Sequence, residues 1–240
     1  RSTLFPYTTL FRSDGAYYAD YTGIMSVGWN ADKYGDISSL DDLLDPKFAG
    51  TVALNGKPAE AGAAFNGYLM ANQLAGGDIN NLQPGLDYFK KLKEAGNLTT
   101  VDVTNGTIDS GQTGVVFDWT YNQASYKKEL KDKGVNWKYK TFPKAQVVSY
   151  YNQAINKDAP HPAAARLWEE YLYTADAQNL WFKGGANPVL LDSMKEDGTV
   201  DQATLKDAIT IEGEPVSYTN DDSTRITEWL QNNWDKTIGN

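Results

Sequence analysis

The chain has 240 residues, of which 41% are hydrophobic and 22% charged, and it carries a formal net charge of −9 with no cysteine. This balance allows a sizeable core and is unlike that of a disordered chain. The acidic charge disfavours nucleic acid and anionic membranes, and no apolar run is long enough to cross a bilayer. Without cysteine, disulfides and thiolate metal sites are excluded. The 15 Tyr and 7 Trp fill a large core or line a ligand cleft, since both rings are flat and apolar with a polar tip.

In chain order, the first segment to interpret is residues 1–13, which read RSTLFPYTTLFRS. This segment lacks the order of charge, apolar run and small cleavage site of a signal peptide, and it resembles a translated sequencing adapter. We interpret it as an artefact and leave it out of the fold. The same hypothesis implies that the natural reading frame was cut near Asp14. A signal sequence and part of the fold would then lie upstream.

The rest of the chain alternates strands with helices. Apolar and aromatic periodicity, with Pro near helix starts and Gly at helix ends, predicts the elements. In chain order these are a strand over 17–29, a helix over 39–49, a strand over 51–54, helices over 58–74 and 84–96, a strand over 101–103, a helical turn over 107–111, a strand over 114–119, a helix over 121–133, strands over 135–142 and 147–155, helices over 159–173 and 176–182, one short helix within 192–220, and a last helix over 223–234. In the helix over 84–96, Leu86, Phe89 and Leu92 form the apolar face. This alternation predicts an α/β protein.

Few residues suit catalysis or metal binding. The single histidine, His161, lies between two prolines at a predicted helix start and suits a surface position. One histidine and no cysteine are too few for a typical zinc site. No phosphate loop or dinucleotide fingerprint is present, and the two Gly-Gly pairs are better explained as helix ends. Carboxylates are plentiful, so glycoside hydrolysis is not excluded by counting.

One cluster of residues has the chemistry of a binding site. Asp118-Trp119-Thr120-Tyr121-Asn122 follows a predicted buried strand and opens a helix. Ligands of open α/β sheets bind beyond the carboxyl ends of the strands. A carboxylate among aromatic rings suits an organic cation, which gains ion pairing and cation–π attraction. The alternative is that Trp119 belongs to the core and Asp118 caps the helix.

Three stretches carry a resemblance to a known family. They are YTGIMSVGWNADK with ISSLDDLLDPKFAGTVAL, then SGQTGVVFDWTYN, and YYNQAINKDAPHPAAARLWEEYLYTADAQNLWFKGGANPV. Together they resemble extracellular solute-binding proteins of ABC transporters, in the type II periplasmic-binding-protein superfamily and nearest to its spermidine/putrescine-binding branch. The resemblance implies an α/β fold of two lobes joined by two crossover strands, closing on ligand about a hinge. Residues 14–35 would form the first crossover strand and the edge of lobe 1, 36–145 lobe 2, and 146–240 the return strand and the C-terminal part of an incomplete lobe 1.

The same resemblance implies the ligand site. The residues that would line it are Glu60, Asp118, Trp119 and Tyr121 from lobe 2, Tyr150, Tyr151 and Asn152 from the return strand, and Tyr21 from the outgoing strand. Tyr150 and Tyr151 point to opposite faces of a strand, which argues against both binding one metal ion. For each residue, packing or solvation is the alternative explanation.

The function implied is that of a receptor, without cofactor or catalysis, that binds a small solute and delivers it to the permease subunits of an ABC importer. The expected solute is a polyamine or related organic cation. Phosphonate and ferric iron are the alternatives within the family, and a carbohydrate-active hydrolase is the alternative of another class. The resemblance further implies a monomer located in the periplasm or outside the cell, with or without a lipid anchor.

Overall fold

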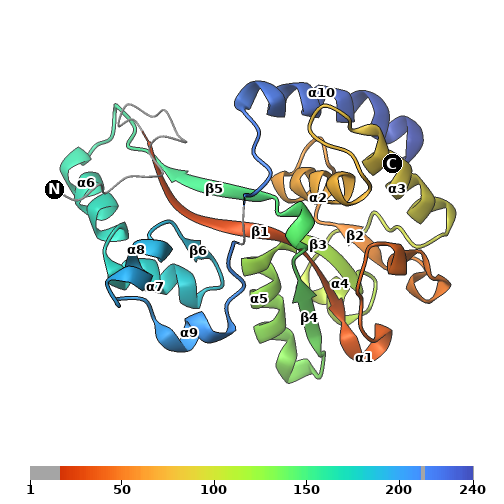
Figure 1. Ribbon diagram of the computed structural model, residues 1–240, viewed down its shortest axis with the longest axis horizontal. Coiled ribbons are helices and arrows are strands. Elements are labelled where there is room, and N and C mark those ends of the chain that lie inside the picture. Colours follow the sequence, from red (N-terminus) through yellow and green to blue (C-terminus); the bar gives the residue numbers. More distant parts are fainter. Residues whose placement is uncertain (1–16, 212–213, 240) are drawn as a thin grey trace. The chain divides into compact units, whose positions relative to one another are not determined.

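A computed structural model describes residues 17–211 and 214–239 (Figure 1). The segment interpreted as an adapter, residues 1–13, lies outside the described residues. The helices are α1 (Ala31–Tyr34), α2 (Gly62–Leu74), α3 (Gln83–Glu94), α4 (Asn105–Asp109), α5 (Thr120–Leu130), α6 (Pro162–Leu172), α7 (Ala175–Lys183), α8 (Leu191–Glu196), α9 (Gln202–Asp207) and α10 (Asn220–Thr237). The strands are β1 (Tyr18–Asn30), β2 (Val52–Leu54), β3 (Val115–Trp119), β4 (Trp137–Lys140), β5 (Val148–Gln153) and β6 (Asn187–Pro188). No described helix combines the length and the apolar character needed to cross a membrane.

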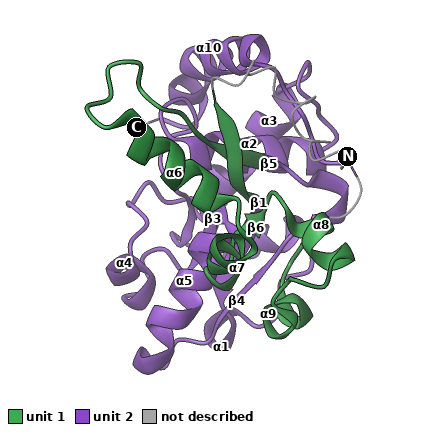
Figure 2. Cartoon of the chain, turned by 90° about the vertical axis from the view of Figure 1, so that its left-hand side faces the viewer, with its two compact units in different colours: residues 1–23, 149–210 green, residues 24–148, 211–240 purple. Residues whose placement is uncertain are grey.

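The chain divides into two compact units (Figure 2). Unit 1 contains the described part of Arg1–Gly23 together with Ser149–Thr210, and unit 2 contains Ile24–Val148 and Ile211–Asn240. The sequence analysis placed all of 146–240 in the return strand and lobe 1. The contact grouping instead puts the segment after residue 210 with unit 2. The reason is the apolar face of α10, where Trp234 packs edge-on against Phe89 of α3 and Tyr68 of α2.

The sheet of unit 2 has the strand order β2-β3-β1-β4. Strand β1 is antiparallel to β3 and β4, while β2 is parallel to β3, with Leu54 beside Phe117. From Ile24 to Trp29, β1 is buried on both faces. At Gly28, a Cβ atom would lie 2.0 Å from Gln123 Oε1 and 2.8 Å from Trp137 Nε1. Glycine is therefore required there, because these two buried side chains hydrogen-bond across the strand at 2.8 Å.

Several predicted elements differ in the structure. The segment 39–49, predicted as a helix, forms two 3-10 turns, Asp41–Leu44 and Pro46–Phe48, because Asp45 is extended before its proline. Residues 101–103 were predicted as a strand and do not form one. The chain instead makes a single bridge earlier, between Leu98 and Val52. Residues 192–220 contain more than the one expected short helix, since α9 follows α8. The last helix begins after Thr219, which with Asp222 forms a reciprocal capping box.

The loop before the first 3-10 turn is held by one carboxylate. Asp42 Oδ2 accepts hydrogen bonds from Ser38 N and Oγ, both at 2.7 Å, and from Ser39 N at 3.0 Å. These bonds, those from Ser38 first, lower the pKa of Asp42 to about 2. A lowered pKa means that the stabilisation is complete above the unfolded-state pKa of about 4 and is lost as the pH falls toward 2.

We therefore expect Asp42→Ala to destabilise the protein by about 1 kcal/mol at pH 6, as for other capping side chains. The difference from the unaltered protein should shrink as the pH falls from 4 to 2. Thermal unfolding followed by circular dichroism over this range measures both effects. Asp41→Ala is the matched control, because Asp41 is exposed and adjacent. An equal loss in both variants, or a loss that does not change with pH, would contradict this account of the loop.

In unit 1, β5 and β6 both pair with β1. Tyr21 lies opposite Pro188, and Thr22 Oγ1 donates a 2.8 Å hydrogen bond to the Ser149 carbonyl. A small core forms from Phe182, Leu191, Met194 and Val200. Helices α6 and α7 leave large apolar side chains exposed: Leu167, Trp168, Tyr171 and Leu180. His161 is an exposed residue that precedes α6, as the sequence predicted.

Candidate functional site

The predicted site residues of unit 2 gather where two parallel strands end. Strand β2 ends at Leu54 and β3 at Trp119. Because the strands are parallel neighbours, their carboxyl ends lie at one edge of the sheet, which we call the carboxyl edge. Helices α2 and α5 begin just after these ends, and neither has a side-chain cap at its N-terminus. Their first backbone N–H groups are thus left to solvent or a ligand.

Asp118 is the most constrained residue at this edge. Its side chain is fully buried, and each carboxylate oxygen accepts two hydrogen bonds. Oδ1 accepts from Trp119 N at 2.8 Å and Asn122 Nδ2 at 2.9 Å. Oδ2 accepts from Asn55 Nδ2 at 2.8 Å and the Tyr126 hydroxyl at 3.0 Å. A carboxylate has about four acceptor positions, so the chain itself fills them.

Burial and hydrogen bonding act in opposite directions on Asp118. Burial raises its pKa above the usual value, and the four hydrogen bonds lower it in part. Burial also raises the pKa of Tyr126, helped by the charge of Asp118. In this conformation Asp118 organises the turn between β3 and α5 and presents no free oxygen to a solute. It is not the N-cap of α5 either, because the cap position belongs to Trp119.

The aromatic residues of this cluster divide between core and surface. Trp119 is 4% exposed and belongs to the main core of unit 2. Tyr121 is half-buried, and its ring stacks on Trp119 with centroids 6.3 Å apart. Trp119 is therefore a core residue, which is the alternative given for it in the sequence analysis. Tyr121 remains the member of the pair with an accessible surface.

Glu60 is exposed in the loop between β2 and α2. Among the described residues its carboxylate has neither a hydrogen bond nor an ion pair. It follows Asn55 by five residues and precedes the uncapped start of α2. Glu60 is therefore the predicted acidic residue with a carboxylate available in this unit.

The predicted residues of unit 1 include a stack of three rings. Tyr21 lies between Tyr151, at a centroid distance of 4.8 Å, and Trp181, at 4.3 Å. Beside it, the buried Asp20 accepts hydrogen bonds from Trp181 Nε1 at 3.1 Å and Gln153 Nε2 at 3.3 Å. Burial raises the pKa of Asp20, while these bonds lower it in part. We call Tyr21, Tyr151 and Trp181 the aromatic stack.

Sequence reasoning identified two rings of the aromatic stack and missed the third. Trp181 is on α7 and was interpreted only as part of a helix, and Asp20 was not singled out. An aspartate one residue before Tyr21 in a buried aromatic strand was the available signal. Tyr150 points away from Tyr151, as strand alternation requires, and burial raises its pKa. Asn152 is exposed and stands outside the stack.

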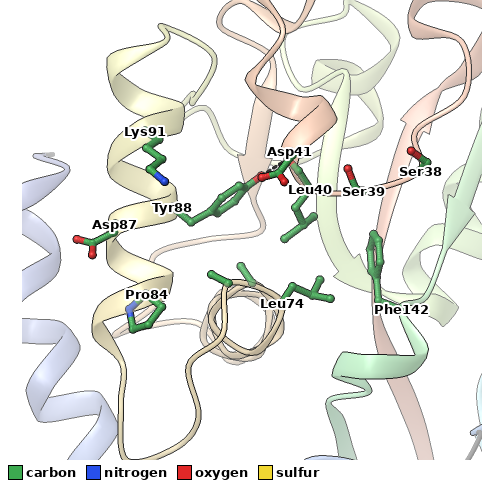
Figure 3. Close-up of a pocket in the computed structure, with 12 residues that line it drawn as sticks. Ser38, Ser39, Leu40, Asp41, Leu74, Pro84, Asp87, Tyr88, Lys91 and Phe142 are labelled. Atoms are coloured by element: carbon green, nitrogen blue, oxygen red, sulfur yellow. Dashed lines mark hydrogen bonds between the residues drawn. The ribbon is translucent and has the colours of Figure 1, made fainter.

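Unit 2 also contains a pocket of about 540 Å³ that holds none of the predicted residues (Figure 3). The end of α2, one face of α3 from Pro84 to Lys91, the Ser38–Asp41 loop and Phe142 line it. Tyr88 reaches across from α3 and donates a 2.8 Å hydrogen bond to the Leu40 carbonyl. Burial raises the pKa of Tyr88, and the charge of Asp41 adds to this effect. The pocket lies at the C-terminal end of α2, whereas the carboxyl edge lies at its N-terminal end.

The described residues offer no group of three or more His, Cys, Asp or Glu side chains that could hold a metal ion. Unit 1 offers the faces of the aromatic stack, and unit 2 offers amides and, among the predicted site residues, the available carboxylate of Glu60. Such groups bind a small organic molecule through stacking and hydrogen bonds. These are groups with which a binding protein of α/β fold recognises a small solute.

Comparison with known proteins gives the family. Residues 2–208 match the bacterial extracellular solute-binding protein family, a range that includes most of the segment set aside as an adapter. The chain belongs to this family, whose members bind small solutes and interact with ABC transporter permeases. A search of curated proteins found no match.

Solved structures confirm the expected fold, that of type II periplasmic binding proteins. AfuA from Actinobacillus pleuropneumoniae, bound to fructose-6-phosphate, is 19% identical with a TM-score of 0.65, and the match covers 93% of this chain and 69% of that one. PotD of Streptococcus pneumoniae, a spermidine/putrescine ABC transporter protein, is 14% identical with a TM-score of 0.65, covering 94% and 70%. A periplasmic thiamin-binding protein is 14% identical with a TM-score of 0.67, covering 94% and 67%. These proteins bind different solutes, so the likeness indicates the fold and not the ligand.

Proposed function

We propose that this chain is the receptor that captures a small organic cation outside the membrane and delivers it, chemically unchanged, to the permease of an ABC importer. The family match over residues 2–208 carries the receptor part of the proposal. The aromatic stack of unit 1 suits a cationic solute, and so, by itself, does the available Glu60 carboxylate of unit 2. Ring faces attract a cation by about 0.5–2 kcal/mol each, and a carboxylate supplies the opposite charge.

The alternatives have weaker support. A hydrolase of glycosides needs two carboxyl groups placed for acid and base work. The buried carboxylates Asp20 and Asp118 belong to different units, and internal hydrogen bonds occupy both. Ferric iron has no cluster of three or more His, Cys, Asp or Glu ligands among the described side chains. Phosphonate keeps one supporting feature, the uncapped start of α2, but Glu60 beside it would repel an anion.

Ligand-dependent thermal stabilisation tests the proposal. A solute at 100 times its dissociation constant should stabilise the native protein by about 2.7 kcal/mol. We expect putrescine or spermidine to raise the melting temperature, and methylphosphonate, ferric citrate and glycosides to leave it unchanged. Stabilisation by methylphosphonate or ferric citrate alone would keep the receptor and change the solute. Turnover of a glycoside would overturn the receptor itself.

A matched pair of tyrosines tests the aromatic stack. Tyr151 is 41% exposed within the stack, whereas Tyr171 is 42% exposed on α6 and contacts Trp168. We expect Tyr151→Ala to weaken binding of the stabilising amine about tenfold, which corresponds to a loss of cation–π attraction. Tyr171→Ala should leave binding unchanged. Titration calorimetry measures both, and equal affinities in the two variants would remove the stack from the site.

A further inference from the structure

The carboxyl edge presents two asparagines in a defined arrangement. Asn55 follows β2, and Asn122 lies in the first turn of α5, which follows β3. Both are half-buried, so part of each amide reaches the surface. They are 67 residues apart in sequence. They lie close together because β2 and β3 are parallel neighbours. The amide N–H of each donates a hydrogen bond to a different oxygen of Asp118, at 2.8 Å for Asn55 and 2.9 Å for Asn122.

This arrangement fixes which end of each amide faces outward. An ionised carboxylate only accepts hydrogen bonds, so both asparagines must turn their NH₂ groups toward Asp118. Trp119 N and the Tyr126 hydroxyl supply the other two donors. Three of these groups, the two amide nitrogens and Trp119 N, can only donate, and the Tyr126 hydroxyl completes four donors when Asp118 is ionised. The carbonyl oxygens of Asn55 and Asn122 then face away from Asp118.

The outward oxygens are available to a solute. Neither carbonyl accepts a hydrogen bond from any described residue, and all the interactions of these two side chains are those just given. Each side chain therefore keeps its carbonyl oxygen, with two acceptor positions, and the second N–H of its NH₂ group. An unpaired carbonyl oxygen discriminates strongly in favour of a partner that donates, because a partner without a donor leaves it unsatisfied.

We infer that Asn55 and Asn122 form a pair of acceptors, oriented by the buried Asp118, that binds the N–H groups of a primary ammonium on the solute. This inference rests on the proposed receptor function and deepens it. Asp118 is then a positioning residue that never contacts the solute. Glu60, on the loop that leads from Asn55 to α2, supplies negative charge on the same side of the sheet.

The first test changes the solute and leaves the protein unaltered. Putrescine carries two ammonium groups with three N–H donors each, and its fully methylated analogue, 1,4-bis(trimethylammonio)butane, carries the same charge with none. We expect the analogue to bind at least tenfold more weakly than putrescine in titration calorimetry. An aromatic site without acceptors would bind the quaternary compound equally well or better, since rings recognise such cations through their faces. That result would overturn the inference.

The second test changes the asparagines. Asn55→Ser and Asn122→Ser remove the outward carbonyl and keep a hydroxyl donor on a shorter side chain. We expect each to weaken putrescine binding about tenfold while binding of the quaternary analogue is unchanged. Asn136→Ser is the matched control: Asn136 is exposed, donates to Asp32 Oδ1 at 2.8 Å, and precedes β4 at the opposite end of β1. Circular dichroism identifies a variant that fails to fold. In that case the comparison of putrescine with its quaternary analogue on the unaltered protein decides whether the inference holds.

The orientation by Asp118 has its own readout. In Asp118→Asn combined with Tyr126→Phe, which removes the hydroxyl that could accept from the new NH₂ group, an asparagine must turn its carbonyl inward and its NH₂ outward. We expect the preference for putrescine over the quaternary analogue to fall toward unity. An unchanged preference would show that Asp118 does not orient the pair. If the unaltered protein binds none of the amines, the proposed cation receptor fails and this inference with it. If it binds putrescine and the variants bind it equally well, the receptor stands and the inference is wrong.

Discussion

Replacing Phe89 by alanine is expected to lower the free energy of unfolding by about 3–5 kcal/mol, the range for a buried aromatic side chain that leaves a cavity. Phe89 is fully buried in the middle of α3. Its ring lies 5.9 Å from those of Tyr68 and Phe117 and 5.3 Å from that of Trp234. It therefore joins α3 to α2, β3 and α10 at once, and no single neighbour can move to fill the space.

Urea unfolding followed by circular dichroism and by tryptophan fluorescence measures this loss. Lys90→Ala is the control on the same helix, because Lys90 is exposed and, within residues 17–211 and 214–239, pairs only with Glu94 at 3.8 Å. An exposed pair of this kind contributes about 0–1 kcal/mol. A loss below 1 kcal/mol for Phe89→Ala, or an equal loss in both variants, would contradict the packing of α3 described here. If the two units unfold separately, the loss should appear in the transition of unit 2 alone.

The same aromatic cluster shows how far periodicity predicts packing. Leu86, Phe89 and Leu92 were predicted as the apolar face of their helix, and all three are buried. That Trp234 covers Phe89 was not predictable, because a helical pattern specifies which face is buried and not which element buries it. Residues 211–240 were assigned to lobe 1 for that reason. Their grouping with unit 2 depends on contacts between residues more than 140 positions apart, such as that of Trp234 with Phe89.

The differences in secondary structure also have local causes. The acidic start and apolar spacing of 39–49 favour a helix, but Pro46 forces the preceding Asp45 into an extended conformation. Val101 to Val103 has β-branched residues without a free strand beside it, and Val101 is exposed. Residues 192–220 are polar, so the short helix α9 gives no apolar period of its own.

The sequence singled out Asp118 by its position and could not predict the contacts that Asp118 makes. Asp118 stands where a buried strand gives way to a helix, and that position alone pointed to a ligand site. Its partners decide what it does there. Asn122 and Tyr126 are near in sequence, whereas Asn55 arrives from another strand. Sequence reasoning counted Asp118 as a charge for the solute, but the structure gives all four of its acceptor positions to the chain itself.

We expect Asp118→Ala to lower the free energy of unfolding by about 2–4 kcal/mol at pH 7, because it leaves four hydrogen-bond donors at a buried position without their acceptor. Some of this cost is recovered where Asn55 and Asn122 can turn toward water, since both are half-buried. Urea unfolding measures the loss. Asp36→Ala is the control, because Asp36 is exposed and forms a surface ion pair with Lys138 at 2.9 Å. A loss no larger than that of Asp36→Ala would show that the network does not stabilise the turn.

The pH dependence separates the charge of Asp118 from its hydrogen bonds. Burial raises its pKa in the folded protein above the unfolded value of about 4. A raised pKa gives a stabilising contribution that is complete below pH 4 and is lost as the pH rises through the folded pKa. Asp118→Asn lacks this titration. The stability of the unaltered protein relative to Asp118→Asn should therefore decline between pH 4 and pH 7 in paired urea titrations. A relative stability that rises over this interval would mean that the four hydrogen bonds outweigh burial, and that the chain holds this carboxylate in its charged form at a net gain.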